Sequence, residues 1–478
     1  MNALAVGVLA TKLPGTGVLA AAAASSLVVI ALLLAVMRRH EHAFPLLAVM
    51  ALPFRVPVST QGKTVNLLIP LYLVVAAGAL AWLLARRESS AEAKGDAARG
   101  GDADAGAPVL VRGASAERLT PRRAAFWISP RGLEALLALA VGLYALQALY
   151  SSDLARAAEN VAFFYVPFGL LALLLGRVQW TRELLLRCLG VLVVLAVIFA
   201  GIGFVEYARK SLFLNPKVVA ANQYDNYFRV NSLFFDPNIY GRFLALVMIA
   251  LSTLVLWGSR RRDVLYAAGA LAWLLAGLVT SFSQSSIAAL LLGLAVLAAW
   301  RWDLRRTLYA ALGLLALGAA VLALAPAGLH FGLKGSGGST SNATSGRTKL
   351  ISGGVELFAK RPLQGYGSGS FETEYKRHSK TTNQNATSAS HTIPVTVAAE
   401  QGILGLALYV ALVSAALLVL FNGAGRSPPR IALASCFAAL VLHTWTYADF
   451  LEDPFTWALL GIGIALARQA RAAPGSSF

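Results

Sequence analysis

Apolar runs of about 20 residues recur along this chain, and each is long enough to cross the hydrocarbon core of a bilayer as a helix. Of the 478 residues, 57% are hydrophobic and only 13% are charged, against roughly 25% charged in soluble domains. Backbone polar groups find no water inside lipid, so such runs fold as helices. No series of segments alternates with period two, as in an outer-membrane barrel. We therefore predict an all-α polytopic membrane protein with about 12–13 transmembrane helices.

The runs give the positions of the predicted helices. They lie at residues 17–37, 44–58, 65–85, 132–150, 157–176, 183–206, 240–258, 264–282, 285–300, 307–326, 394–421, 431–448 and 455–470. The run 44–58 is short and contains three prolines, which predicts a broken or re-entrant helix. Both cysteines, Cys188 and Cys436, fall in or beside apolar runs, so we expect neither a disulfide framework nor a cysteine-ligated metal site.

The distribution of charge predicts the orientation of the chain and its division into regions. Basic clusters such as "GSRRRD" and "RWDLRR" are typical of cytoplasmic loops, so the net charge of +18 is not by itself a nucleic-acid signal. The Ala/Gly/charged stretch 86–131 lacks apolar periodicity and is predicted to be a disordered cytoplasmic linker. The predicted regions are N-terminal spans (1–85), this linker (86–131), central spans (132–326), a large external loop (327–393) and C-terminal spans (394–478).

The predicted external loop 327–393 is basic. It holds eight Lys or Arg residues and three Glu, which gives 8 − 3 = +5. Because the positive-inside rule disfavours basic residues outside, this charge suggests an anionic ligand. A loop of this length can also escape the rule or rest on anionic lipid headgroups, so both interpretations stay open.

Four stretches facing this predicted outer side carry residues suited to chemistry. "GRTKLISGGVELFAKRPLQGYGSGSF" predicts a helix over 347–359 that begins at Arg347, followed by a glycine turn whose N–H groups could bind an anion. "LVTSFSQSSI" forms a hairpin with hydroxyls and the Gln284 amide, or simply a helix cap at Ser283 or Ser285. In "RVNSLFFDPNIYGR", Asp236 reads first as a helix cap before Pro237.

The fourth stretch is "SASHTIPVTVAAEQGILG", in which His391 stands just before a predicted span. A lone histidine there is more often structural, but its ordinary pKa near 6.5 suits proton abstraction at neutral pH. Glu400 lies nine residues on, and an acid inside a membrane helix is a functional candidate by default.

Together these stretches resemble the bacterial O-antigen ligase and polymerase superfamily over roughly residues 229–420. The elements that carry the resemblance are "FFDPNIYG" (234–241), "SGRTKL" (345–350), "RPLQGYGSGSF" (361–371), "SHTI" (390–393) and "EQGILG" (400–405). Each element is short, and their order and spacing make the match specific. The sequence departs from the family pattern in three places. Gln284 replaces the arginine of the outer hairpin, Thr392 follows the histidine in place of asparagine, and the predicted linker 86–131 is not a feature of the family.

The resemblance implies a GT-C-like membrane fold and a metal-independent, inverting glycosyltransferase that needs no cofactor. Such an enzyme passes a glycan from undecaprenyl pyrophosphate to an acceptor hydroxyl at the outer face of the bacterial cytoplasmic membrane. Arg347 would hold the departing pyrophosphate and His391 would act as the general base. The remaining residues implied in substrate or pyrophosphate binding are Gln284, Ser283, Arg229, Arg242, Lys349 and Tyr366. Those implied in support are Asp236, Asn238 and Glu400.

Several alternatives stay open at this stage. An O-antigen ligase would use lipid A core or another lipid or cell-wall acceptor, whereas a polymerase would use a second lipid-linked repeat. A lipid or anion transporter would also suit many spans and a basic vestibule, although the first half shows no repeat of the 229–420 pattern. A membrane scaffold would be indifferent to the loss of His391. Membrane lipids are expected as partners, and nucleic acid is not.

Overall fold

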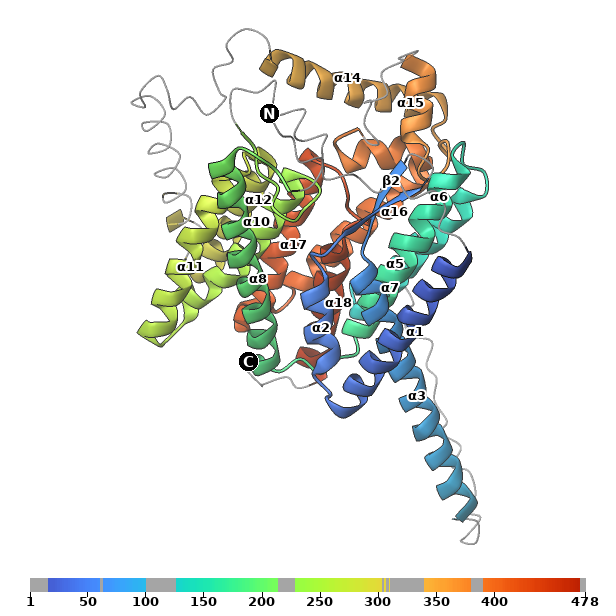
Figure 1. Ribbon diagram of the computed structural model, residues 1–478, viewed down its shortest axis with the longest axis vertical. Helices are drawn as coiled ribbons and strands as arrows, with labels where there is room; N and C mark the ends of the chain where they lie inside the picture. Colours follow the sequence, from blue (N-terminus) through green and yellow to red (C-terminus); the bar gives the residue numbers. More distant parts are fainter. Residues whose placement is uncertain are drawn as a thin grey trace, which may run out of the picture.

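The computed structural model of the chain describes residues 16–60, 63–99, 126–213, 228–302, 305–306, 309, 339–379 and 390–472. Long helices dominate this part of the chain (Figure 1). They are α1 (Thr16–Arg39), α2 (Ala43–Ala51), α3 (Ile69–Arg99), α5 (Pro130–Ala148), α6 (Leu154–Asn160), α7 (Val166–Leu175), α8 (Arg182–Arg209), α10 (Pro237–Trp257), α11 (Arg261–Thr280), α12 (Gln284–Arg301), α14 (Ser339–Lys360), α15 (Phe371–Ser379), α16 (Ile393–Phe421), α17 (Pro428–Thr446) and α18 (Pro454–Ala472).

Nine helices in the described residues are long and apolar enough to cross a membrane. This confirms the prediction of an all-α polytopic membrane protein. Two further predicted spans correspond to α17 and α18, which pack in the same bundle. The predicted span 307–326 lies outside the described residues apart from Tyr309.

Two N-terminal segments have a form that the apolar runs did not specify. The predicted broken helix at 44–58 is confirmed: α2 ends at Ala51, and the chain then forms an antiparallel hairpin of β1 (Val56–Thr60) and β2 (Lys63–Leu67). The hairpin pairs Val56 with Leu67 and Thr60 with Lys63. In contrast to the predicted linker from residue 86, α3 continues to Arg99.

One short segment interrupts regular α-helix between α6 and α7. Residues Val161–Tyr165 form the π-helix η1, so α6, η1 and α7 make one continuous candidate span. A short 3-10 turn, η3 (Ala424–Arg426), links α16 to α17.

The bundle has two distinct ends. Figure 1 shows α14 and α15 together at one end, whereas the last turns of α3 project from the opposite end. We call these the loop end and the α3 end. Because α10, α12 and α16 begin where α17 finishes, the chain segments between these helices gather at the loop end.

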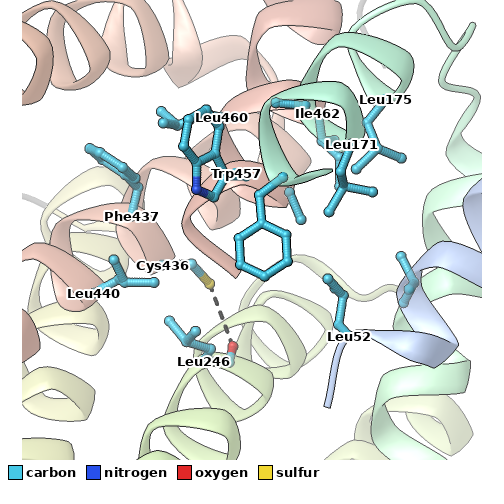
Figure 2. Close-up of a cluster of buried hydrophobic side chains, with 14 of the residues drawn as sticks. Leu52, Leu171, Leu175, Leu246, Cys436, Phe437, Leu440, Trp457, Leu460 and Ile462 are labelled. Carbon is cyan, nitrogen blue, oxygen red and sulfur yellow. Dashed lines mark hydrogen bonds between the residues drawn. The ribbon is translucent and has the colours of Figure 1, made fainter. Parts of the chain in front are cut away.

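Helix α10 lies at the centre of the bundle and α1 at its edge. In the candidate span of α10, 72% of the residues are buried, whereas in the candidate span of α1 only 6% are buried. Figure 2 shows part of the core, where α2 and α7 meet α10, α17 and α18 through Leu52, Leu171, Leu246, Phe437 and Trp457. The Cys436 thiol donates to the Leu246 carbonyl at 3.5 Å, and both cysteines are unpaired. The central position of α10 fixes what its first turn presents at the loop end.

Candidate active site at the loop end

The first turn of α10 is capped as the sequence predicts. Asp236 accepts a hydrogen bond from the Asn238 N–H at 2.6 Å, and Pro237 occupies the first helical position. Proline is tolerated there because that N–H has no partner within the helix. The capping role of Asp236 is therefore confirmed, and the cap leaves the Asn238 side chain free to face neighbouring helices.

A polar network joins α10, α12 and α17 at this end. The Asn238 Oδ1 accepts from Arg229 Nη2 at 3.2 Å and from Ser283 Oγ at 2.9 Å. Ser283 Oγ in turn lies 2.7 Å from Ser286 Oγ, which lies 3.1 Å from His443 Nε2. Ser283, Ser286 and His443 are fully buried. Because buried polar groups are costly unless they are hydrogen-bonded, this network fixes the three helix ends relative to one another.

The hairpin between α11 and α12 presents Gln284 outward. Ser283 caps α12 by accepting from the Ser286 N–H, which confirms the capping role considered for it. Gln284 is the first residue of α12 and is exposed. Arg229 lies against the same hairpin and donates from Nε to the Ser281 carbonyl at 3.2 Å. A guanidinium therefore lies beside the hairpin although position 284 itself has none.

His391 lies at the same end of the bundle. Its ring centroid is 6.1 Å from that of Tyr447, which is 5.7 Å from the ring of His443. Burial and the carboxylates of Asp236 and Asp449 raise the pKa of Tyr447 well above its ordinary value, so the phenol is neutral beside Asp236. Tyr447 thus connects His391, the cap of α10 and the polar network.

The backbone of His391 is unusual for a residue with a side chain. Its φ is +59°, in the left-handed region that costs non-glycine residues free energy. Phe282 in the α11–α12 hairpin and Asp449 in the loop after α17 also have positive φ. Strained backbone of this kind is found most often at functional sites. Three such residues therefore surround one end of the bundle.

Arg242 is committed to an internal ion pair. Its guanidinium lies 2.8 Å from the Asp453 carboxylate, and both side chains are only 2% exposed. Arg242 Nη1 is also 3.4 Å from the carbonyls of Ala448 and Asp449. Burial raises the pKa of Asp453, and Arg242 opposes this shift. Arg242 therefore holds the loop 447–453 against α10, and its charge is largely neutralised there.

The external helix begins earlier than the sequence suggested. Helix α14 starts at Ser339, so Arg347 is its ninth residue, and the prediction that Arg347 adds to the helix N-terminus was wrong. The side chain of Arg347 is outside the described part. Arg347 lies seven residues, about two helical turns, before Gly354. A methyl group at Gly354 would lie 2.5 Å from Val395 Cγ1, so α14 packs against the start of α16 at Gly354.

Most basic residues described in the external loop have partners within it. Lys360 pairs with Glu356, Lys376 with Glu372 and Arg377 with Glu374. The Arg361 guanidinium lies 4.5 Å from the centroid of Tyr366, which is 6% exposed and packs in a small apolar cluster. Lys349 is exposed on α14. Of the predicted anion-binding residues, Lys349 thus faces solvent and Tyr366 is enclosed.

The glycine turn after α14 does bind an anion, but the anion belongs to the chain. Gly365, Gly367 and Gly369 all have positive φ, as a tight turn requires. The N–H groups of Gly369 and Phe371 donate to the Glu400 carboxylate at 2.9 and 3.0 Å. The predicted anion-binding turn is therefore occupied by Glu400, which anchors the external loop to α16.

Sequence reasoning missed His443, Tyr447 and Asp453. They come from α17 and the loop after it, "YADFLEDP", which carries three acids between two apolar runs. This acidic cluster could have indicated that the segment does more than connect two helices. Their proximity to Ser286, His391 and Arg242 depends on contacts between residues 56 to 211 positions apart, which no local pattern reports.

The polar network gives a first testable expectation. Replacing Ser286 by alanine leaves His443 and Ser283 each without one partner inside the bundle. We expect the free energy of unfolding to fall by about 1–3 kcal/mol, measured by thermal unfolding in detergent. The matched control is S352A, which replaces an exposed serine on α14. It should change the free energy of unfolding by less than about 0.5 kcal/mol. Equal stability of S286A and S352A would show that the network does not hold the helix ends.

Comparison with known proteins supports an assignment for this part of the chain. The family model described as O-antigen ligase matches residues 269–410, from within α11 to the middle of α16. This range contains Gln284, Arg347, His391 and Glu400. None of the curated proteins compared with the chain matches it.

Proposed function

Because a family model described as O-antigen ligase matches residues 269–410, we propose that the chain is a ligase of this superfamily that transfers a glycan from undecaprenyl pyrophosphate to an acceptor hydroxyl. The match supports an enzyme of the O-antigen ligase or polymerase type. The donor, the acceptor and the roles of individual residues are our proposal. It rests chiefly on the packing of α14 along the first turns of α16.

That packing runs parallel. Gly354 of α14 lies against Val395, and the Pro362 carbonyl, just beyond α14, accepts from the Ile403 N–H. The two contacts are eight residues apart on both segments. Arg347 lies seven residues before Gly354 in α14, and His391 lies four residues before Val395, just ahead of the start of α16. The register therefore supports a site shared by Arg347 and His391.

The proposed reaction is a single displacement at the anomeric carbon. The acceptor oxygen forms the new glycosidic bond as the bond to the pyrophosphate oxygen breaks, which inverts the anomeric configuration. His391 takes the acceptor proton, and the bonding electrons leave with the lipid pyrophosphate. Arg347 stabilises the charge that develops on that leaving group through charge-assisted hydrogen bonds.

Other residues at the loop end fit supporting roles. Gln284 and Lys349 are exposed and can contact sugar or phosphate oxygens. Arg229 lies at the hairpin, where it adds positive charge, while Asn238 and Ser283 hold that hairpin in place. Arg242 acts indirectly by fixing the loop that carries Tyr447.

The charge distribution supports an outward-facing site in the cytoplasmic membrane. Arg38 and Arg39 end α1, and Arg38 pairs with Glu88 of α3, so these basic residues lie toward the α3 end. Basic residues collect on the cytoplasmic side of membrane proteins. The loop end then faces the outer side, where lipid-linked glycans and their acceptors meet.

Transfer by the purified full-length protein tests the proposal. The substrates are a labelled undecaprenyl pyrophosphate-linked glycan with either a lipid A core acceptor or more of the same lipid-linked glycan, in EDTA. We expect transfer to persist in EDTA and to fall about 10²-fold in R347A, because one stabilising donor for the leaving group is lost.

The two acceptors separate the two types of enzyme. A single addition to lipid A core supports a ligase, whereas a ladder of repeats on the lipid carrier would identify a polymerase. K360A is the matched control, since Lys360 is paired with Glu356 on the far end of the same helix and should leave transfer unchanged. Full activity of R347A would remove the pyrophosphate-holding role.

A further inference from the structure

Helix α16 is broken near its start. Gly402 has φ +66° and ψ −161°, far from helical values, so Ile393–Gln401 and the residues after Gly402 form two helical segments. The external loop supplies the hydrogen bonds that the break removes. The Tyr366 and Gly367 N–H groups donate to the carbonyls of Ala399 and Glu400 at 3.3 and 2.8 Å, and the Ile403 N–H donates to the Pro362 carbonyl at 2.7 Å.

The Glu400 side chain completes this contact. Its two carboxylate oxygens accept from two different N–H groups of the loop, Gly369 and Phe371. Glu400 is only 8% exposed, and a buried carboxylate is costly unless it is hydrogen-bonded. Bonds to a charged acceptor are roughly twice as strong as neutral ones. Through its backbone carbonyl and its carboxylate, Glu400 thus accepts hydrogen bonds from three residues of the turn, Gly367, Gly369 and Phe371.

The other side of the loop is fixed to the N-terminal half of the bundle. The Tyr150 hydroxyl donates to the Gln364 carbonyl and the Ser151 hydroxyl to the Ser368 carbonyl, both at 2.8 Å. The Ser152 N–H donates to the Tyr366 carbonyl at 3.1 Å. The turn therefore lies between the α5–α6 corner and α16, with little freedom to move against either.

We propose that Glu400 is a positioning residue that sets Arg347 relative to His391. This inference rests on the proposed function. His391 and Glu400 stand nine residues apart on the same short segment before the break. Arg347 belongs to α14, whose C-terminal end continues directly into the turn that Glu400 holds. The Glu400 carboxylate thus fixes Arg347, which binds the leaving pyrophosphate, relative to His391, which takes the acceptor proton.

This arrangement predicts a specific defect when the charge is removed. In E400Q the side chain keeps one acceptor oxygen, but its amide group faces a loop N–H that needs an acceptor. The turn and α14 should then shift relative to α16. The interaction that suffers is the one made by Arg347, whereas proton uptake by His391, on the same segment as Glu400, should persist.

The test is a double-mutant cycle between Glu400 and Arg347. In the full-length protein, E400Q should lower kcat/KM for the lipid-linked donor by about 10-fold or more, with an unchanged pH profile and acceptor KM. The double variant E400Q/R347A should be no slower than R347A, because a positioning residue has nothing left to position. Losses that multiply would overturn the inference.

Glu206 provides the matched control. It is a buried glutamate in the last turn of α8 that accepts from three N–H groups between α8 and α10, those of Phe213, Asn231 and Ser232. E206Q removes the same charge but does not touch α14. Its effect on transfer should multiply with that of R347A. Coupling of E206Q as strong as that of E400Q would indicate general loss of structure and would also contradict the inference.

A distance measurement tests the same idea without activity. Spin labels on cysteines at Ser352 of α14 and Leu404 of α16, both exposed, report the separation of the two helices. We expect a narrow distribution in the parent and a shifted or broadened one in E400Q, with E400D, which keeps the charge, in between. An unchanged distribution in E400Q would refute the positioning role. Absence of transfer by the parent protein would instead refute the proposed function and leave the distance result standing, whereas full transfer in R347A would remove the role of Arg347 that Glu400 is proposed to position.

Discussion

Replacing His391 by alanine is expected to slow glycan transfer by about 10³-fold while the protein stays folded. A positioned general base typically contributes 10²–10⁴ to a rate, and His391 is the described histidine at the mouth of α16 within the matched family range. The acceptor hydroxyl is a poor nucleophile until its proton is taken. The measurement is the single-turnover rate with the lipid-linked donor and saturating acceptor.

Two companion variants make the result specific. H391N accommodates the left-handed backbone of position 391, which asparagine adopts readily, but lacks the base, so it should be as slow as H391A. H378A removes a histidine of the same loop whose Nδ1 contacts the Glu374 carbonyl, and it should leave the rate unchanged. An active, folded H391A would make His391 structural and would mean that another group takes the acceptor proton.

Replacing Gly367 by alanine is expected to destabilise the protein strongly. Gly367 has φ +95°, which alanine adopts at a cost of about 1–2 kcal/mol. The new methyl group would also collide with the backbone of Ser151 in the α5–α6 corner. Overpacking of this kind costs about 1–3 kcal/mol more. The sum is about 2–5 kcal/mol, read as a lower thermal midpoint in detergent together with loss of transfer.

The control is a glycine with space around it. Gly142 lies within helix α5, and a methyl group there meets nothing within 4 Å. G142A should be neutral or stabilising by up to about 1 kcal/mol, because alanine is the better helix former. If G367A were as stable as G142A, the turn would not be held against the α5–α6 corner as described.

The sequence predicted the features whose signals are local. Apolar runs located the spans, and the order Asp236–Pro237 predicted a capped helix start that the structure confirms. The glycine turn was also predictable, because alternating glycines mark positions that need positive φ. Each of these signals lies within a few residues of the structure it specifies.

What the sequence could not predict depends on distant partners or on weak propensities. Helix α14 includes "STSNATS", residues with low helix propensity, so its start at Ser339 was hidden. The first part of the predicted linker is rich in Ala, Glu, Lys and Arg, which favour helix, and α3 extends into it. That Glu400 would occupy the turn, or that Tyr447 would lie beside His391, follows from tertiary packing alone.

The break at Gly402 has a consequence for the depth at which the helix sits. The residues after it, 403–421, number 19 and rise by roughly 28 Å as an α-helix, close to the thickness of a bilayer's hydrocarbon core. They can cross the membrane without help from the first segment. Ile393–Gln401 is then free to lie in the headgroup region, where water and lipid phosphates are at hand. Glu400 would thereby avoid the cost of a charge in hydrocarbon, and His391 would stand where a lipid pyrophosphate naturally rests.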